Sequence, residues 1–127
     1  MEQNSKLEFY IDSIVLISAL INFCNSTVVE LGLLTESNYG HGFKNICDTI
    51  NRTVERINSF VQKWENDSDG ICGTLKTIKE YYTYYCITLG SSSPELFICD
   101  VKYITDSVKT SKLALEYKLK KIKNKIW

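Results

Sequence analysis

Glycine and proline are scarce in this 127-residue chain, which holds six glycines and one proline. Sandwiches and barrels need many tight turns, so this scarcity argues against an all-β fold. It argues equally against a disordered or low-complexity chain. Hydrophobic residues make up 44% of the sequence, which is enough to form a sizeable core. We therefore expect residues 1–127 to fold as a single helical domain of ordinary size.

Histidine is almost missing, since His41 is the only one and stands between two glycines. General acid–base and triad chemistry commonly needs a histidine near a nucleophile or a carboxylate. We expect His41 to be an exposed turn residue. The Glu-x-x-His pairs of di-iron bundles and the His-Glu-x-x-His zinc motif are both absent. The sequence therefore predicts that the protein is not an enzyme, and an enzyme with an unrecognised site is the least favoured alternative.

Cysteine pairs with metal-binding spacing are also missing, because none of the five cysteines forms Cys-x-x-Cys. If the helices alternate in direction, four thiols would lie towards the same end of the fold: Cys24, Cys47, Cys86 and Cys99. Zinc is one alternative there, and a Cys86–Cys99 disulfide in an oxidising compartment is another. Cys99 falls off the apolar stripe of its helix, however. We favour buried thiols with Cys99 partly exposed, and we expect no metal or other cofactor.

Two further patterns resemble sites without completing them. Cys72 stands near the start of a predicted helix, where backbone N–H groups lower a thiol pKa, but no base can be named for it. The acidic segment 65–70 has the spacing of a calcium loop, yet Lys76 occupies the position where a bidentate glutamate should stand. We interpret that segment as a polar turn that ends a helix.

Apolar residues recur at spacings of three and four through four segments, at about residues 5–34, 42–65, 71–89 and 94 to the end. The first segment is apolar on more than one face, and we expect it to be the most buried. Ser93, Pro94 and Glu95 suit the start of the last helix. The connections are short, so neighbouring helices should be antiparallel. The sequence predicts an all-α, antiparallel up-down four-helix bundle with a long C-terminal helix.

That C-terminal helix would be about 45 Å long at 1.5 Å per residue, too long for the third helix to cover. Its end must project, pack against the first helix, or contact another molecule. The choice among these stays open in the sequence.

No targeting segment stands out. The apolar run over residues 14–24 is interrupted by Ser18 and Asn22 and is expected to be too short to span a bilayer. The N-terminus is acidic where a signal peptide would be basic. We expect a soluble cytoplasmic protein without a transmembrane segment. The excess of lysine over arginine and the many Ile, Asn and Tyr residues suggest an AT-rich genome, such as that of a phage, a large virus or another mobile element, which would place the protein in a host cytoplasm.

Charge is unevenly distributed although the formal net charge is zero: residues 109–127 hold seven lysines and one acid. The residues singled out for binding are Lys118, Lys120, Lys121, Lys123, Lys125 and Trp127. They could meet a protein partner, neutralise phosphates of a nucleic acid, or lie at a membrane interface. They could also simply favour the negative end of the helix dipole and keep the helix soluble.

Tyrosines are concentrated at residues 81–85, where four occur in five positions. Helical spacing places Tyr82 and Tyr85 in the core and leaves Tyr81 and Tyr84 partly exposed. We also expect Tyr39 and Tyr103 on the surface. Exposed tyrosines often anchor protein interfaces, and they also stack on nucleobases.

These features predict a small non-enzymatic interaction module that binds and blocks, as an inhibitor, or scaffolds a protein partner. Such a role is typical of accessory proteins of phages, viruses and mobile elements. A second copy of the chain, in a homodimer, is one alternative partner. Nucleic-acid binding through the C-terminal lysines is the other alternative, and zero net charge and scarce arginine weaken it.

Overall fold

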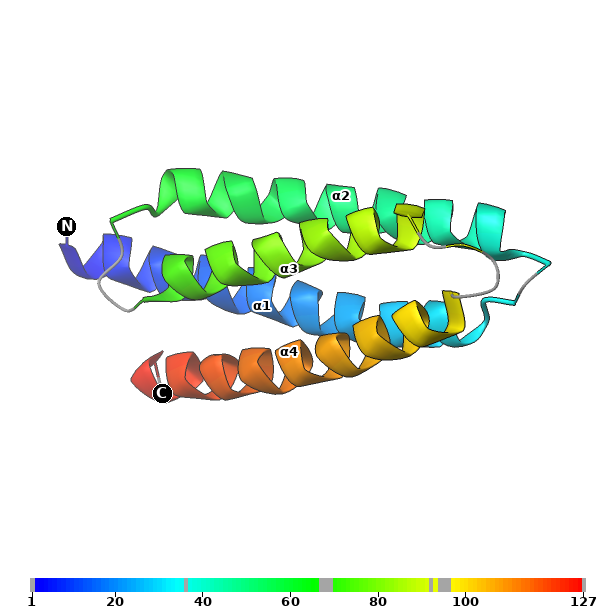
Figure 1. The fold of residues 1–127 in the computed structure, drawn as a ribbon. Helices are drawn as coiled ribbons and strands as arrows, with labels where there is room; N and C mark the ends of the chain where they lie inside the picture. Colours follow the sequence, from blue (N-terminus) through cyan, green and yellow to red (C-terminus); the bar gives the residue numbers. More distant parts are fainter. Residues whose placement is uncertain (1, 36, 67–69, 92, 94–96, 127) are drawn as a thin grey trace.

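The computed structural model describes residues 2–35, 37–66, 70–91, 93 and 97–126, with the side chains of residues 2–4 excepted. Four helices account for most of them: α1 (Glu2–Gly32), α2 (Tyr39–Lys63), α3 (Ile71–Ser91) and α4 (Phe97–Ile126). No strand occurs in these ranges. Successive helices run in opposite directions, so α1 begins and α4 ends at the same end of the bundle (Figure 1). The predicted all-α, up-down four-helix bundle with a long C-terminal helix is confirmed.

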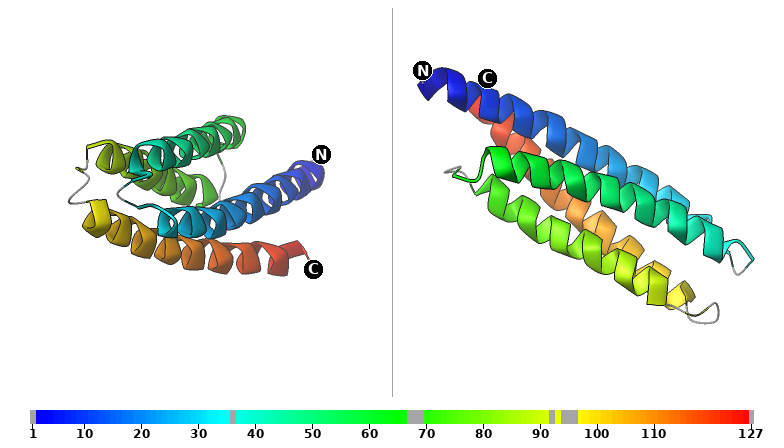
Figure 2. Two further views of the ribbon diagram at one scale, coloured as in Figure 1. Left: turned by 90° about the vertical axis from the view of Figure 1, so that its right-hand side faces the viewer. Right: turned by 90° about the horizontal axis from the view of Figure 1, so that it is seen from above.

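The helices are packed unequally. α4 lies chiefly along α1, and α3 lies chiefly along α2, whereas α3 and α4 meet least among the helices that lie side by side (Figure 2). The buried apolar side chains of all four helices nevertheless form one cluster. Because α3 and α4 touch so little, the bundle is open on that side.

The end of α4 packs against α1 instead of projecting. α1 and α4 are 31 and 30 residues long, so α1 can cover α4 to its end. Leu115 and Ile122 of α4 are buried, and Lys125 lies 5.8 Å from the ring centre of Tyr10 on α1. The sequence left three alternatives for the end of α4: projection, packing against α1, or contact with another molecule. The nearly equal lengths of α1 and α4 allow it to pack against α1.

α1 is less enclosed than its composition predicts. Both of its apolar stripes contribute to the core, but an outward row stays exposed: Leu7, Ile11, Val15, Val29 and Leu33. A bundle helix has neighbours on only part of its circumference, so a helix that is apolar all round must leave some apolar surface in contact with solvent.

The expectation that this apolar run is too short to span a bilayer was wrong. The stretch Ser5–Gly32 is long and apolar enough to cross a membrane by length and composition, and it is only partly buried. α1 extends well beyond residues 14–24 on both sides and continues through Ser18 and Asn22, the two residues that were expected to interrupt the apolar run. The same length and composition occur in core helices of soluble proteins.

The start of α2 also differs from the prediction, because the helix begins at Tyr39 and takes in His41 in its first turn. Tyr39 was expected on the surface, and that was wrong: it is 6% exposed, its ring lies 4.7 Å from that of Phe97, and its hydroxyl donates to the Leu89 carbonyl at 2.5 Å. This side chain ties the start of α2 to the end of α3 and the start of α4. His41 is exposed as expected, but on a helix and not in a turn. Pro94 and Glu95, expected to begin the last helix, lie outside the described residues.

Candidate functional site

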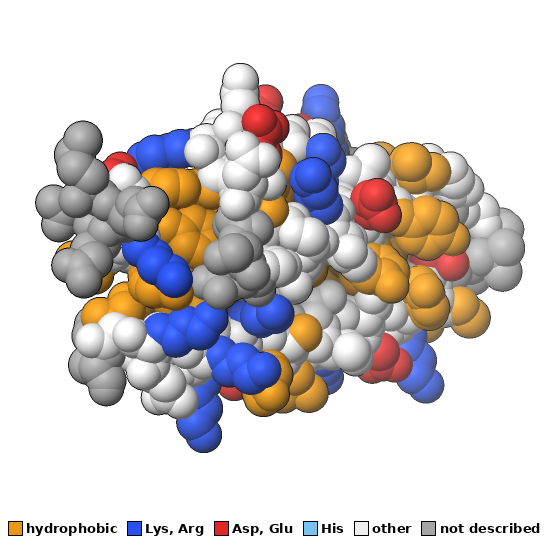
Figure 3. Space-filling view, turned by 90° about the vertical axis from the view of Figure 1, so that its left-hand side faces the viewer, with side chains coloured by type: hydrophobic (Ala, Val, Ile, Leu, Met, Phe, Trp, Pro, Cys, Tyr) orange, Lys and Arg blue, Asp and Glu red, His pale blue; other side chains and the backbone are white. Residues whose placement is uncertain are grey.

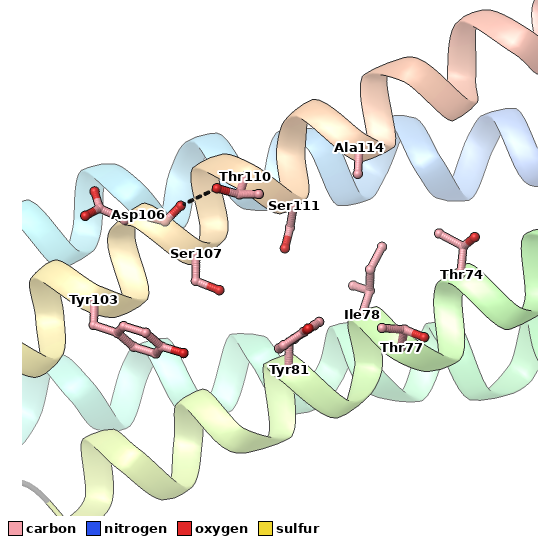
Figure 4. Close-up of a pocket in the computed structure, with 10 residues that line it drawn as sticks. All are labelled: Thr74, Thr77, Ile78, Tyr81, Tyr103, Asp106, Ser107, Thr110, Ser111 and Ala114. Carbon is pink, nitrogen blue, oxygen red and sulfur yellow. Dashed lines mark hydrogen bonds between the residues drawn. The ribbon is translucent and has the colours of Figure 1, made fainter.

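An open groove of about 560 Å³ lies between α3 and α4, where the bundle is least packed. Small side chains cause it, since Thr, Ser and Ala dominate the facing positions of both helices and cannot fill the space between them. Figure 4 shows the lining residues, which are Thr74, Thr77, Ile78 and Tyr81 of α3 and Tyr103, Asp106, Ser107, Thr110, Ser111 and Ala114 of α4.

Two tyrosines border this groove from opposite helices. Tyr81 of α3 is 49% exposed and Tyr103 of α4 is 60% exposed, although both line the groove. Their rings lie in the space between the two helices (Figure 4). A tyrosine offers a large apolar face and a hydroxyl that can donate or accept a hydrogen bond, which is why it is favoured as an anchor at interfaces.

The threonines of the groove use their hydroxyls within their own helices. Thr74 donates to the Gly70 carbonyl at 3.2 Å, Thr77 to the Gly73 carbonyl at 3.2 Å, and Thr110 to the Asp106 carbonyl at 3.0 Å. These bonds satisfy the hydroxyls locally. The groove is therefore less polar than its composition suggests, and it suits apolar side chains better than a charged small molecule.

Ser107, which lines the groove, is hydrogen-bonded through its hydroxyl to the hydroxyl of the buried Tyr85. Tyr85 is 1% exposed, and burial raises the pKa of its phenol, an effect that its hydrogen bonds to Ser107 and Ser111 oppose. Tyr85 thus stays neutral and links α3 to α4 below the surface. The predicted placement of Tyr82 and Tyr85 in the core is confirmed.

The predicted exposure of Tyr81 and Tyr84 is also confirmed, but the structure separates them. Tyr84 is 54% exposed and does not line the groove, whereas Tyr81 does. The helical spacing in the sequence predicts Tyr103 on the surface but gives no reason to connect it with Tyr81. The spacing of small residues on α4, at Ser107, Ser111 and Ala114, was the available signal for a loosely packed helix face.

The C-terminal lysines are divided between two sides of α4. Lys118 and Lys121 follow Ala114 at spacings of four and seven, so they continue the groove side of the helix. Lys120 and Lys123 lie on another side, around a shallow depression with Glu116 and Leu119.

Several Lys or Arg side chains lie on the face of the molecule at the end of the bundle where α4 ends (Figure 3). Lys121 lies 4.8 Å from the ring centre of Tyr117, while Lys125 lies over Tyr10 of α1. Trp127, the last predicted site residue, lies outside the described residues. The predicted binding residues thus form separate groups instead of one patch.

The structure arranges the cysteines differently from a zinc site and from a Cys86–Cys99 pair, the two alternatives that the sequence offered. Cys24 is buried with its Sγ 3.6 Å from the Tyr82 hydroxyl, and burial raises its thiol pKa. Cys72 is buried and donates to the Trp64 carbonyl at 2.9 Å. Cys99 is exposed, as predicted.

Cys86 lies against Cys47 of α2, so the alternative pairing of Cys86 with Cys99 is not favoured. Within the described ranges, no group of three His, Cys, Asp or Glu side chains is placed to hold a metal ion. Residues 67–69 of the segment that resembles a calcium loop lie outside those ranges.

Comparison of the chain with protein families, with curated proteins and with solved structures finds no match.

Proposed function

We propose that this protein is a non-enzymatic interaction module that binds a protein partner through the groove between α3 and α4. The observation that carries this proposal is an open, largely apolar groove bordered by the exposed rings of Tyr81 and Tyr103. Exposed aromatic residues beside a concave apolar surface are the usual anchors of protein recognition. Bound in this way, the module would block or scaffold its partner.

A helix is the partner element that fits this groove best. The α4 residues that line it run from Tyr103 to Ala114, which at 1.5 Å per residue spans about 17 Å, or about three turns of a bound helix. An amphipathic helix laid there would direct apolar side chains at positions i, i+3 or i+4, and i+7 between α3 and α4. Lys118 and Lys121 continue the same side of α4, so carboxylates at one end of the bound helix would be favoured.

Replacing Thr77 with arginine should weaken partner binding at least tenfold, because a long charged side chain would occupy the groove. Thr77 is exposed and its hydroxyl bonds only to its own helix, so the fold should tolerate the change. Affinity capture from the native host would first identify the partner retained by the unmodified protein. Titration calorimetry with that purified partner should then show a Kd raised at least tenfold, or about 1.4 kcal/mol.

Thr83→Arg is the matched control, since Thr83 is also exposed on α3 and also donates to its own helix, at 3.0 Å to the Lys79 carbonyl. It does not line the groove. The control should bind the partner with unchanged affinity. Equal binding by both variants would show that the partner uses another surface.

Nucleic-acid binding through the end of α4 is a second candidate function. Among the residues that the structure describes, no carboxylate pairs with Lys118, Lys120, Lys121 or Lys123, so these ammonium groups are available to phosphates. Binding would be sequence-independent, and log K would fall with log salt by about 0.7–0.9 for each phosphate neutralised.

For nucleic-acid binding we expect the double variant Lys120→Ala with Lys123→Ala to neutralise two fewer phosphates. The slope of log K against log salt should then become shallower by about 1.4–1.8. Fluorescence anisotropy with labelled DNA and RNA over a range of salt concentrations measures the slope. Absence of binding at low ionic strength would eliminate nucleic acid as a ligand.

A further inference from the structure

Two cysteines from different helices meet near the end of the bundle where α2 begins and α3 ends. The Sγ of Cys86 on α3 lies 3.9 Å from the carbonyl oxygen of Cys47 on α2, which places the two cysteines side by side. α2 and α3 are extensively packed antiparallel neighbours, so the pair is held by the fold and not by a loop. Both side chains are partly exposed, which distinguishes them from the buried Cys24 and Cys72.

From this geometry we propose that Cys47 and Cys86 form a reversible disulfide that links α2 to α3. The two cysteines are 39 residues apart on consecutive helices, and the packing of α2 on α3 brings them together. Partial exposure allows a small oxidant to reach the sulfurs. The proposal is independent of the groove and of any partner.

The surroundings of the two thiols differ, so that one is suited to attack an oxidant and the other to resolve the mixed disulfide that forms. The Cys86 thiol donates a hydrogen bond that lowers the pKa of Cys47, although burial and the neighbouring Asp48 oppose the lowering. The same hydrogen bond, together with burial, raises the pKa of Cys86. Cys47 is therefore the more readily ionised, and a thiolate is the attacking species in disulfide exchange.

The oxidant class is a low-molecular-weight disulfide such as glutathione disulfide. The Cys47 thiolate attacks one sulfur of glutathione disulfide, so a mixed disulfide forms on Cys47 and one glutathione leaves as its thiolate. Cys86 then loses its proton to water and attacks the Cys47 sulfur, so the second glutathione leaves. The two cysteines are oxidised by two electrons, and glutathione disulfide is reduced to two glutathione thiols.

Peptide mapping of the full-length protein after incubation with glutathione disulfide tests the proposal. Trypsin leaves Cys47 in the peptide 45–52, and it leaves Cys86 and Cys99 together in the peptide 80–102. After alkylation of free thiols, a Cys47–Cys86 bond joins these two peptides. A Cys86–Cys99 bond would instead leave peptide 80–102 separate and two hydrogens lighter.

Three variants complete the test. The joined peptides should persist in Cys99→Ser and disappear in Cys47→Ser and in Cys86→Ser. Oxidation should raise the Tm of the unmodified protein and of Cys99→Ser by about 10 °C, because the bond closes a long loop of the unfolded chain. Free thiols, a glutathione adduct that is never resolved, or a bond within peptide 80–102 would overturn the proposal. Mapping of the unmodified protein decides the outcome even if a variant fails to fold.

Discussion

Replacing Tyr82 with alanine should lower the free energy of unfolding by about 3–5 kcal/mol, the cost of deleting a large aromatic side chain from a core. Tyr82 is 0% exposed, its ring lies 5.0 Å from that of Phe23 and 6.0 Å from that of Tyr85, and its hydroxyl meets the Cys24 thiol. Burial also raises the pKa of this phenol, so it stays neutral. Urea unfolding followed by far-UV circular dichroism measures the loss.

Tyr84→Ala is the matched control, two residues along the same helix. Tyr84 is 54% exposed and should cost less than about 0.5 kcal/mol when removed. The contrast between the two variants tests the rotation of α3 about its axis. Similar losses at both positions would mean that α3 presents a different face to the core.

Replacing Ile122 with alanine should cost about 2–4 kcal/mol, because Ile122 is 2% exposed near the end of α4. The prediction tests whether α4 stays packed on α1 over its last turns. Leu113→Ala is its control, since Leu113 lies on the same helix and is 67% exposed. The same urea unfolding experiment applies. If Ile122→Ala were as mild as the control, the end of α4 would have to be frayed or free in solution, and the lysines there would be far more available to a ligand.

The fold could be predicted because its main determinants are local and periodic. Apolar residues at spacings of three and four specify helices, and short polar connections specify antiparallel neighbours. The same periodicity separated Tyr82 and Tyr85 from Tyr81 and Tyr84 correctly, because residues on one helix are related by a rotation that the sequence alone determines.

The failures occurred where contacts between helices mattered. Tyr39 lies just before the predicted start of a helix, so its burial depends on the ends of α3 and α4, which only the packed bundle brings to it. The fate of the α4 terminus depended on the length of α1. The apolar surface left outward on α1 depended on which parts of its circumference its neighbours cover.

The candidate site was predicted only in part. Tyr81 was identified from its position on α3, but the groove also needs Tyr103 and the small residues of α4. A groove is a property of two surfaces at a given separation, and the sequence reports neither the separation nor the pairing. The cysteines show the same limit, since the sequence offered Cys86 and Cys99 as a pair and the packing of α2 on α3 brings Cys47 to Cys86 instead.

The sequence by itself thus determined four helices, their alternating directions and the face that most of them bury, because each of these follows from local spacing along one chain. The tertiary structure alone decided that α4 lies on α1, that α3 and α4 leave a groove and that Cys47 meets Cys86. Those features depend on how side chains of different helices fill shared space, and that packing is settled only when the whole bundle is assembled.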